Sequence, residues 1–215
     1  MIDFDKDAKV IRMYGVIGEF DDEISAVDFM KTLDNFTGED LTVLLKSPGG
    51  EIDDGLSIYG QLQAYPGKVT MEIDTQAASI ATIVAMGADE IVMRKRSEMF
   101  IHDPWTLAMG NSMEFRNVAR LLDELALDIA GVYQDRTGIE ASEWMRMMRE
   151  TRRFNADQAV AIGLADRVLD NAKGAKMLIG CAGTQEEPAP PTARLKAGII
   201  GSLLDKRHRT RKAGS

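Results

Sequence analysis

The sequence is poor in the residues that build disulfides and metal sites. Its 215 residues include one cysteine, Cys181, and two histidines, His102 and His208. A disulfide within one chain is therefore impossible, and none of the usual zinc sites can be assembled from a single copy. The sequence thus predicts neither a metal ion nor a cofactor, and only two residues can supply an imidazole to catalysis.

Long apolar runs and an excess of positive charge are also lacking. No apolar run approaches the ~18 residues that a membrane-spanning helix needs, and the acidic N-terminus has no apolar segment typical of a signal peptide. The chain has 26 basic and 34 acidic residues, a formal net charge of −8, which argues against general nucleic-acid binding. We expect a cytoplasmic protein that binds neither membranes nor nucleic acid.

The C-terminal end differs from this acidic average. Three of the six prolines fall within the stretch QEEPAPP at 185–191, and the following residues 192–215 include seven basic residues and one acidic residue. We expect one domain over 1–180, followed over 181–215 by a linker and a flexible basic tail. The tail either docks to an acidic partner, such as a capsid or scaffold protein, or is a disordered solubilising end.

Strands that alternate with helices predict an α/β fold. Val69, Met71 and Ile73 alternate with polar residues, which indicates a strand. The longest helical pattern has apolar residues at every third or fourth position from about 111 to 136. We expect strands over 10–17, 41–45, 69–73, 90–93 and 99–102, and helices from about 22, 52, 79, 111, 142 and 155.

Three places after expected strand ends could carry chemistry, because α/β folds bind ligands there. The first is Ser-Pro-Gly-Gly at 47–50. Proline and glycine are typical of a tight turn, but glycine also leaves a backbone N–H unobstructed, as an oxyanion hole requires.

The second place is Ser79, and the third is His102. A serine at a helix start is usually a cap or a packing residue, but at a strand-to-helix turn it is also a candidate nucleophile, with the N–H of Ile80 available to an oxyanion. His102 is the only histidine in the expected domain, since His208 lies in a basic run. Asp103 adjoins His102, but neighbouring residues of a strand point to opposite faces, so we do not expect it to be the partner of His102.

These motifs, in this order, resemble the proteolytic subunit of the Clp protease from about Val10 to Val168. The chain looks most similar to the Clp-like head maturation proteases of tailed phages and prophages, which share its motifs at 101–106, 109–111 and 136–138. The resemblance implies a spiral of ββα units, which crotonases also have, with a protruding handle helix in the region of about 104–138.

The resemblance also implies roles for individual residues. Ser79 matches the family's nucleophile and His102 its general base. Gly50 and Ile80 match the two backbone donors of the oxyanion hole, and Gly49 matches a substrate-binding position. A serine triad of this kind attacks a peptide carbonyl and forms an acyl-enzyme that water hydrolyses.

The third triad member is less clearly marked in the sequence. Thr151 falls at the position of the family's acid in an ungapped alignment, and a shift of one residue brings Glu150 there. We take Glu150 as the acid. The alternatives are that Glu150 is a solvated carboxylate among neighbouring arginines, and that the chain works as a Ser–His dyad.

The function that the resemblance implies is a serine endopeptidase that processes phage capsid assembly proteins during prohead maturation in the bacterial host cytoplasm. It implies a homo-oligomeric ring, a heptamer or stacked rings, acting on polypeptides. The N-terminal segment with which longer relatives meet their ATPase is short or lacking in the sequence, so we do not expect a Clp ATPase partner. Two alternatives remain: a crotonase-fold acyl-CoA enzyme, and a catalytically inactive Clp-like ring or scaffold component.

Overall fold

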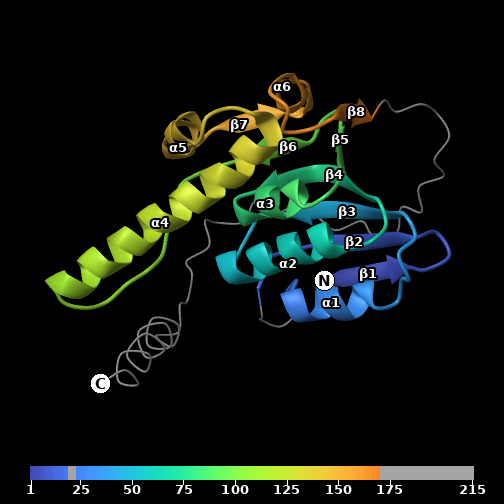
Figure 1. Ribbon diagram of the computed structural model, residues 1–215, viewed down its shortest axis with the longest axis horizontal. Coiled ribbons are helices and arrows are strands. Elements are labelled where there is room, and N and C mark those ends of the chain that lie inside the picture. The colour runs from blue at the N-terminus through green and yellow to red at the C-terminus, as the bar shows by residue number, and fades with distance from the viewer. Residues whose placement is uncertain (19–22, 170–215) are drawn as a thin grey trace, which may run out of the picture.

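A computed structural model describes residues 1–18 and 23–169 of the chain. They form an α/β fold with an eight-stranded mixed sheet (Figure 1). The basic tail, Cys181, His208 and the expected helix start at Asp22 lie outside the described residues. The elements are β1 (Ile2–Asp5), β2 (Val10–Tyr14), α1 (Ala26–Leu33), β3 (Leu41–Ser47), α2 (Ile52–Ala64), β4 (Val69–Ala78), α3 (Ile80–Met86), β5 (Glu90–Arg94), β6 (Glu98–Phe100), α4 (Ser112–Thr137), α5 (Ala141–Arg149), β7 (Arg153–Asn155), α6 (Ala156–Ala161) and β8 (Arg167–Leu169).

The sheet is mainly parallel. Its strand order is β1-β2-β3-β4-β5-β8, and β6 pairs with the far end of β4 on one side and with β7 on the other. The pairs from β2 to β8 and the pair β4–β6 are parallel, whereas β1 and β7 are antiparallel to their partners. The long strand β4 therefore borders three parallel neighbours and forms the centre of the sheet.

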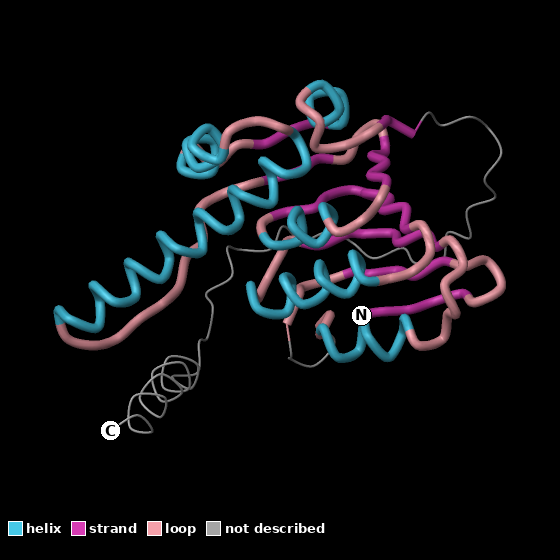
Figure 2. Tube along the Cα trace, in the orientation of Figure 1, coloured by secondary structure: helices cyan, strands magenta, loops and turns pink. Residues whose placement is uncertain are grey.

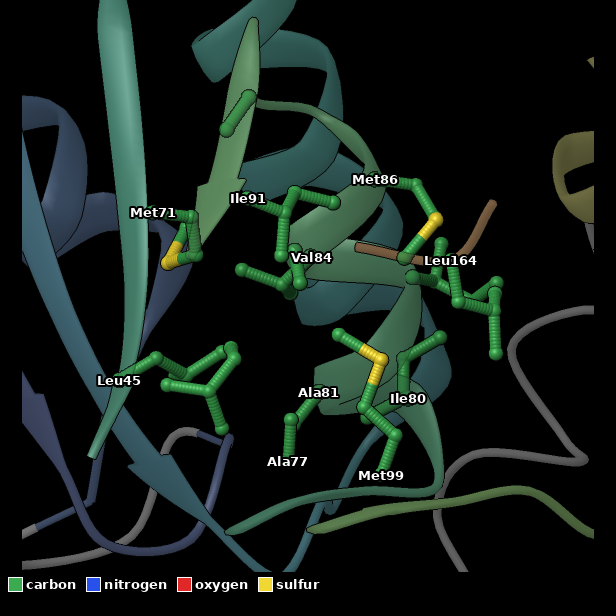
Figure 3. Close-up of a cluster of buried hydrophobic side chains, with 14 of the residues drawn as sticks. Leu45, Met71, Ala77, Ile80, Ala81, Val84, Met86, Ile91, Met99 and Leu164 are labelled. Carbon is green, nitrogen blue, oxygen red and sulfur yellow. The ribbon is translucent and has the colours of Figure 1, made fainter. Parts of the chain in front are cut away.

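The core lies between this sheet and the helices that cover it. The alternating residues Val69, Met71 and Ile73 of β4 are fully buried, as their spacing predicts. All seven residues of α3 are buried, which its run of alanine and β-branched residues permits. Figure 3 shows side chains of α3 such as Ala81 and Val84 gathered with those of the neighbouring strands.

The helix α4 projects from the body as the expected handle does (Figure 1). Asn111 caps it in a reciprocal capping box with Glu114, and Gly138 ends it in the left-handed conformation at φ 72°. Its buried residues, Ala126, Ile129, Ala130 and Tyr133, all lie in its second half. Figure 2 shows that the segment between β6 and α4 is a loop that runs out to the free end of the helix.

Some boundaries differ from the prediction. The strand expected over 99–102 ends at Phe100, so His102 lies beyond it in a loop. The first helix begins at Ala26, and the hydroxyl of Ser25 accepts a hydrogen bond from the Asp28 N–H as its cap. The three-residue strands β7 and β8 were not expected, because they are held by pairing with distant strands rather than by a local pattern.

Candidate active site

The three candidate segments meet where parallel strands end. Ser47 at the end of β3 pairs with Ala77 of β4, and Ala78 pairs with Phe100 at the end of β6. The residues that follow these strands are the Ser-Pro-Gly-Gly turn, Ser79 and His102. The sheet therefore gathers all three segments at one edge, as expected for a ligand site in an α/β fold.

Ser79 occupies a sharp turn between β4 and α3. Its backbone is at φ 56°, ψ −131°, a conformation that residues with a side chain rarely adopt. Its N–H donates to the Phe100 carbonyl at 2.8 Å, which anchors the turn to β6. A strained strand-to-helix turn of this kind exposes a serine hydroxyl at the end of the sheet, as in the nucleophile elbow of other hydrolases.

The two glycines of the turn at 47–50 allow close backbone approach. Gly49 is at φ +96°, and a Cβ added there would lie 2.6 Å from the Cβ of Ser79 and 2.7 Å from the carbonyl oxygen of Ala78. A Cβ at Gly50 would lie 1.9 Å from the carbonyl oxygen of Ile17. The turn thus packs directly against the candidate nucleophile at Gly49 and against the Ile17 backbone at Gly50, so a side chain at Gly49 would separate the turn from Ser79.

Two backbone N–H groups beside Ser79 have no acceptor among the described residues. Around Gly50, the Ile17 N–H donates to the Gly49 carbonyl and the Glu51 N–H donates to the Ile17 carbonyl, which leaves the Gly50 N–H unused. Ile80 is the first residue of α3, so its N–H has no carbonyl of a preceding helical turn to accept a hydrogen bond from it. Both groups are available to an oxyanion.

His102 is half-buried, and its ring stacks on Phe100 with centroids 5.6 Å apart. Burial lowers the pKa of His102, while a hydrogen bond to the Asp103 backbone and the charge of Asp103 raise the pKa by less. The imidazole is therefore mainly neutral at neutral pH and can accept a proton. Within the described part of the chain, no hydrogen bond joins the Ser79 hydroxyl to the His102 ring.

The pairing of β6 with β7 determines where the candidates for the third residue of the catalytic triad lie. Phe100 pairs with Arg153, and the Ile101 N–H donates to the Arg152 carbonyl at 2.9 Å. This antiparallel register, continued by one residue, puts Thr151 opposite His102. Thr151 is at φ 57°, in the left-handed region.

Glu150 ends α5 and lies at the surface. Its carboxylate forms ion pairs with Arg146 and, at 3.6 Å, with Arg152. No ion pair or hydrogen bond between Glu150 and His102 is found in residues 1–18 and 23–169. The fold therefore brings the turn at 150–151 beside His102, but it directs this carboxylate to arginines.

The reason given for discounting Asp103 as the partner of His102 does not hold in the structure, although no hydrogen bond joins the Asp103 carboxylate to His102 among the described residues. Because β6 ends at Phe100, the alternation of a strand does not apply to His102 and Asp103. The charge of Asp103 acts on His102, and its Oδ1 atom is buried without a hydrogen-bond partner. Only the observed end of the strand could have revealed this, because Met99–Ile101 reads as a continuous apolar segment.

No group of three or more His, Cys, Asp or Glu side chains in the described ranges could hold a metal ion. None of the helices in these ranges has the length and apolar character to cross a membrane.

The sequence is similar to those of known proteins. The sequence model of the family described as Clp protease matches residues 8–172. Three curated relatives are each named ATP-dependent Clp protease proteolytic subunit. The protein of Ligilactobacillus salivarius is 27% identical over 172 residues, 77% of this chain and 86% of that protein. The protein of Pleurastrum terricola is 24% identical over 73% of this chain and 83% of its own length, and that of Chlorella vulgaris is 25% identical over 62% and 67%.

Proposed function

The chain belongs to the Clp protease family and is a serine-type endopeptidase, and we propose that Ser79 is its nucleophile and His102 its general base. The neutral His102 ring accepts the proton of the Ser79 hydroxyl as the oxygen attacks a peptide carbonyl. The resulting imidazolium then protonates the leaving amine, and water hydrolyses the acyl-enzyme. The lowered pKa of His102 supports this role, since a base must be neutral to act.

The N–H groups of Gly50 and Ile80 are the proposed donors to the oxyanion. The observation that carries this proposal is that neither group has an acceptor among the described residues, while Ile80 follows the strained Ser79 and Gly50 follows Gly49, which packs against Ser79. Two such donors stabilise the negative charge that develops only in the transition state, and losing one typically costs about 10²–10³ in rate. Gly49 completes the proposed site as a backbone contact for the bound peptide.

Glu150 is the proposed third member of the triad. It is one residue from the position opposite His102, and to orient the His102 ring its carboxylate would have to leave Arg146. The alternatives are Thr151, which lies opposite His102 if the register of β6 and β7 continues, and a Ser–His dyad.

The proposed assembly is a homo-oligomeric ring, a heptamer or stacked rings. Large apolar side chains are exposed along the loop after β6 and on α4, which is unusual for a monomer. They include Trp105, Leu107, Met109, Met113 and Phe115, with exposed fractions from 51% to 95%. We extend the proposal to the substrate: a capsid assembly protein of a phage prohead, cleaved in the bacterial cytoplasm.

Labelling with a fluorophosphonate probe tests the site. We expect mass spectrometry to find the probe on Ser79, and we expect the Ser79→Ala and His102→Ala variants to react at least ~10³-fold more slowly. Ser57→Ala is the matched control, because Ser57 is exposed on α2 and its hydroxyl accepts a hydrogen bond from the Gln61 side chain rather than from the site. A folded wild-type protein that leaves Ser79 unmodified would instead indicate an inactive ring component or a crotonase-type enzyme.

The substrate is tested separately by co-expression with a phage scaffold protein. We expect the wild type to cleave the scaffold protein and Ser79→Ala to leave it intact. An active enzyme that leaves the scaffold protein whole would contradict the capsid role without contradicting the chemistry.

A further inference from the structure

The peptide group between Ser79 and Ile80 has two ends that face different parts of the protein. A trans peptide is planar, so its C=O and its N–H point in opposite directions. The Ser79 carbonyl accepts hydrogen bonds from the Thr82 N–H at 2.9 Å and from the Thr82 hydroxyl at 2.7 Å. Whatever holds this carbonyl therefore also sets the direction of the Ile80 N–H.

Thr82 is in turn held by a residue from a distant helix. Thr82 is fully buried, and its Oγ1 lies 2.5 Å from the hydroxyl oxygen of Tyr133 in α4, 51 positions along the chain. Burial raises the pKa of Tyr133, so its hydroxyl keeps its proton. Because the Thr82 proton is donated to the Ser79 carbonyl, the Tyr133 hydroxyl is the donor to Thr82. Two hydrogen bonds in series thus end at the Ser79 carbonyl.

Tyr133 is itself fixed on two sides. Its ring packs on Trp144 of α5 with centroids 4.8 Å apart. Its carbonyl accepts from the Thr137 hydroxyl at 2.7 Å, and that hydroxyl oxygen accepts from the Trp144 indole N–H at 3.1 Å. The end of the chain of hydrogen bonds is therefore a rigid part of the core.

We propose that Thr82 and Tyr133 are positioning residues that aim the Ile80 N–H at the oxyanion. This inference rests on the proposed function of Ser79 and Ile80. The need for such support follows from the backbone of Ser79, whose φ of 56° persists only where the surroundings stabilise it. Rotation of the Ser79–Ile80 peptide by half a turn would move ψ of Ser79 from −131° to the ordinary left-handed region near about +50°, which relieves the strain but turns the Ile80 N–H away from the substrate.

The contribution of Tyr133 distinguishes this arrangement from an ordinary helix feature. A threonine hydroxyl that bonds to the carbonyl of the preceding turn is common in helices. Here a second hydroxyl, from the base of α4, holds the threonine in that rotamer. The orientation of the Ile80 N–H thereby depends on how α4 packs against α3.

The test removes one hydroxyl at a time and measures kcat and KM on a fluorogenic peptide. Tyr133→Phe should lower kcat roughly tenfold, less than the 10²–10³ that loss of an oxyanion donor costs, and should leave KM unchanged. Thr82→Val should lower kcat at least as much, and Thr82→Ser should restore most of the rate. Adding Tyr133→Phe to Thr82→Val should cause little further loss, because both act through one bond.

Tyr65→Phe is the matched control. It removes a tyrosine hydroxyl that donates one hydrogen bond, here to the Glu39 carbonyl at 2.9 Å, but Tyr65 follows α2 and belongs to neither α3 nor α4. The inference is overturned if Tyr133→Phe keeps kcat within twofold of wild type, if Tyr65→Phe loses as much, or if KM changes instead of kcat. If Tyr133→Phe does not fold, the Thr82→Val and Thr82→Ser pair decides. Failure of wild-type Ser79 to label would refute the proposed function, whereas a labelled wild type with an unimpaired Tyr133→Phe would refute this inference alone.

Discussion

Replacing Gly49 with alanine tests how closely the turn at 47–50 must approach Ser79. The new Cβ would lie 2.6 Å from the Cβ of Ser79, 2.7 Å from the Ala78 carbonyl oxygen and 3.3 Å from the Ile80 nitrogen. Two of these three atoms belong to the backbone, and the third is the first atom of a short side chain. No flexible group can move aside, so the turn and the serine must separate.

The expected loss in the free energy of unfolding is the sum of two costs. A residue with a side chain at φ +96° costs about 1–3 kcal/mol, and over-packing of a tight site adds about 1–3 kcal/mol. We therefore expect Gly49→Ala to lower the free energy of unfolding by about 2–6 kcal/mol. A shift of about 1 Å between reacting groups can cost 10²-fold, so we also expect kcat/KM to fall by about 10².

Urea unfolding and the rate of fluorophosphonate labelling measure these two effects. Gly60→Ala is the matched control, because Gly60 is exposed within α2 and a Cβ there would meet nothing within 4 Å. Alanine should stabilise that helix by about 0.5–1 kcal/mol without changing the labelling rate. A Gly49→Ala protein as stable and as reactive as wild type would refute the close approach described above.

Three further predictions concern the base, its orientation and the core. Because burial lowers the pKa of His102 below 6.5, kcat/KM should be constant at neutral pH and fall as the pH drops below 6.5. Asp103→Asn removes a charge that raises this pKa, so it should move the fall to lower pH. A midpoint above pH 6.5 in the wild type would contradict the role of His102 as the base. If Glu150 orients His102, Glu150→Gln should lower kcat by up to about 10⁴, whereas a loss below tenfold in steady-state kinetics would favour Thr151 or a dyad. Trp144→Phe removes the indole hydrogen bond to a threonine, worth about 0.5–1.5 kcal/mol, and part of a fully buried ring, so urea unfolding should show a loss of at least about 1 kcal/mol. An unchanged midpoint would contradict this packing.

Local patterns predicted the elements that carry their own periodicity. The alternation around Met71 predicted the central strand β4, and the repeat of apolar residues over 111–136 predicted α4 within one residue at each end. The strand β7 was missed because its three residues are held by the antiparallel pairing with β6. That pairing also decides which residue lies opposite His102, so the sequence alone could not choose between Glu150 and Thr151.

The sequence predicted which residues belong to the candidate site, but it did not predict the contacts that hold them. The order of the motifs indicated Ser79 and His102, and the fold brings their segments to one edge of the sheet. The contact between Tyr133 and Thr82 joins residues 51 positions apart, and neither belongs to a motif. Such contacts depend on how α4 packs against α3, and no local sequence pattern encodes this packing.

The uneven burial of α4 has a consequence for its local stability. A 26-residue helix spans about 39 Å, but its buried side chains begin only at Ala126. Helical turns without tertiary contacts are marginally stable in water, so in a subunit outside the proposed ring the amide hydrogens near Met113 should exchange through local fraying, while those near Tyr133 should exchange only when the whole domain unfolds. The two halves of the continuous helix α4 thus differ in local stability, and hydrogen exchange along it would show at which residue the stable half begins.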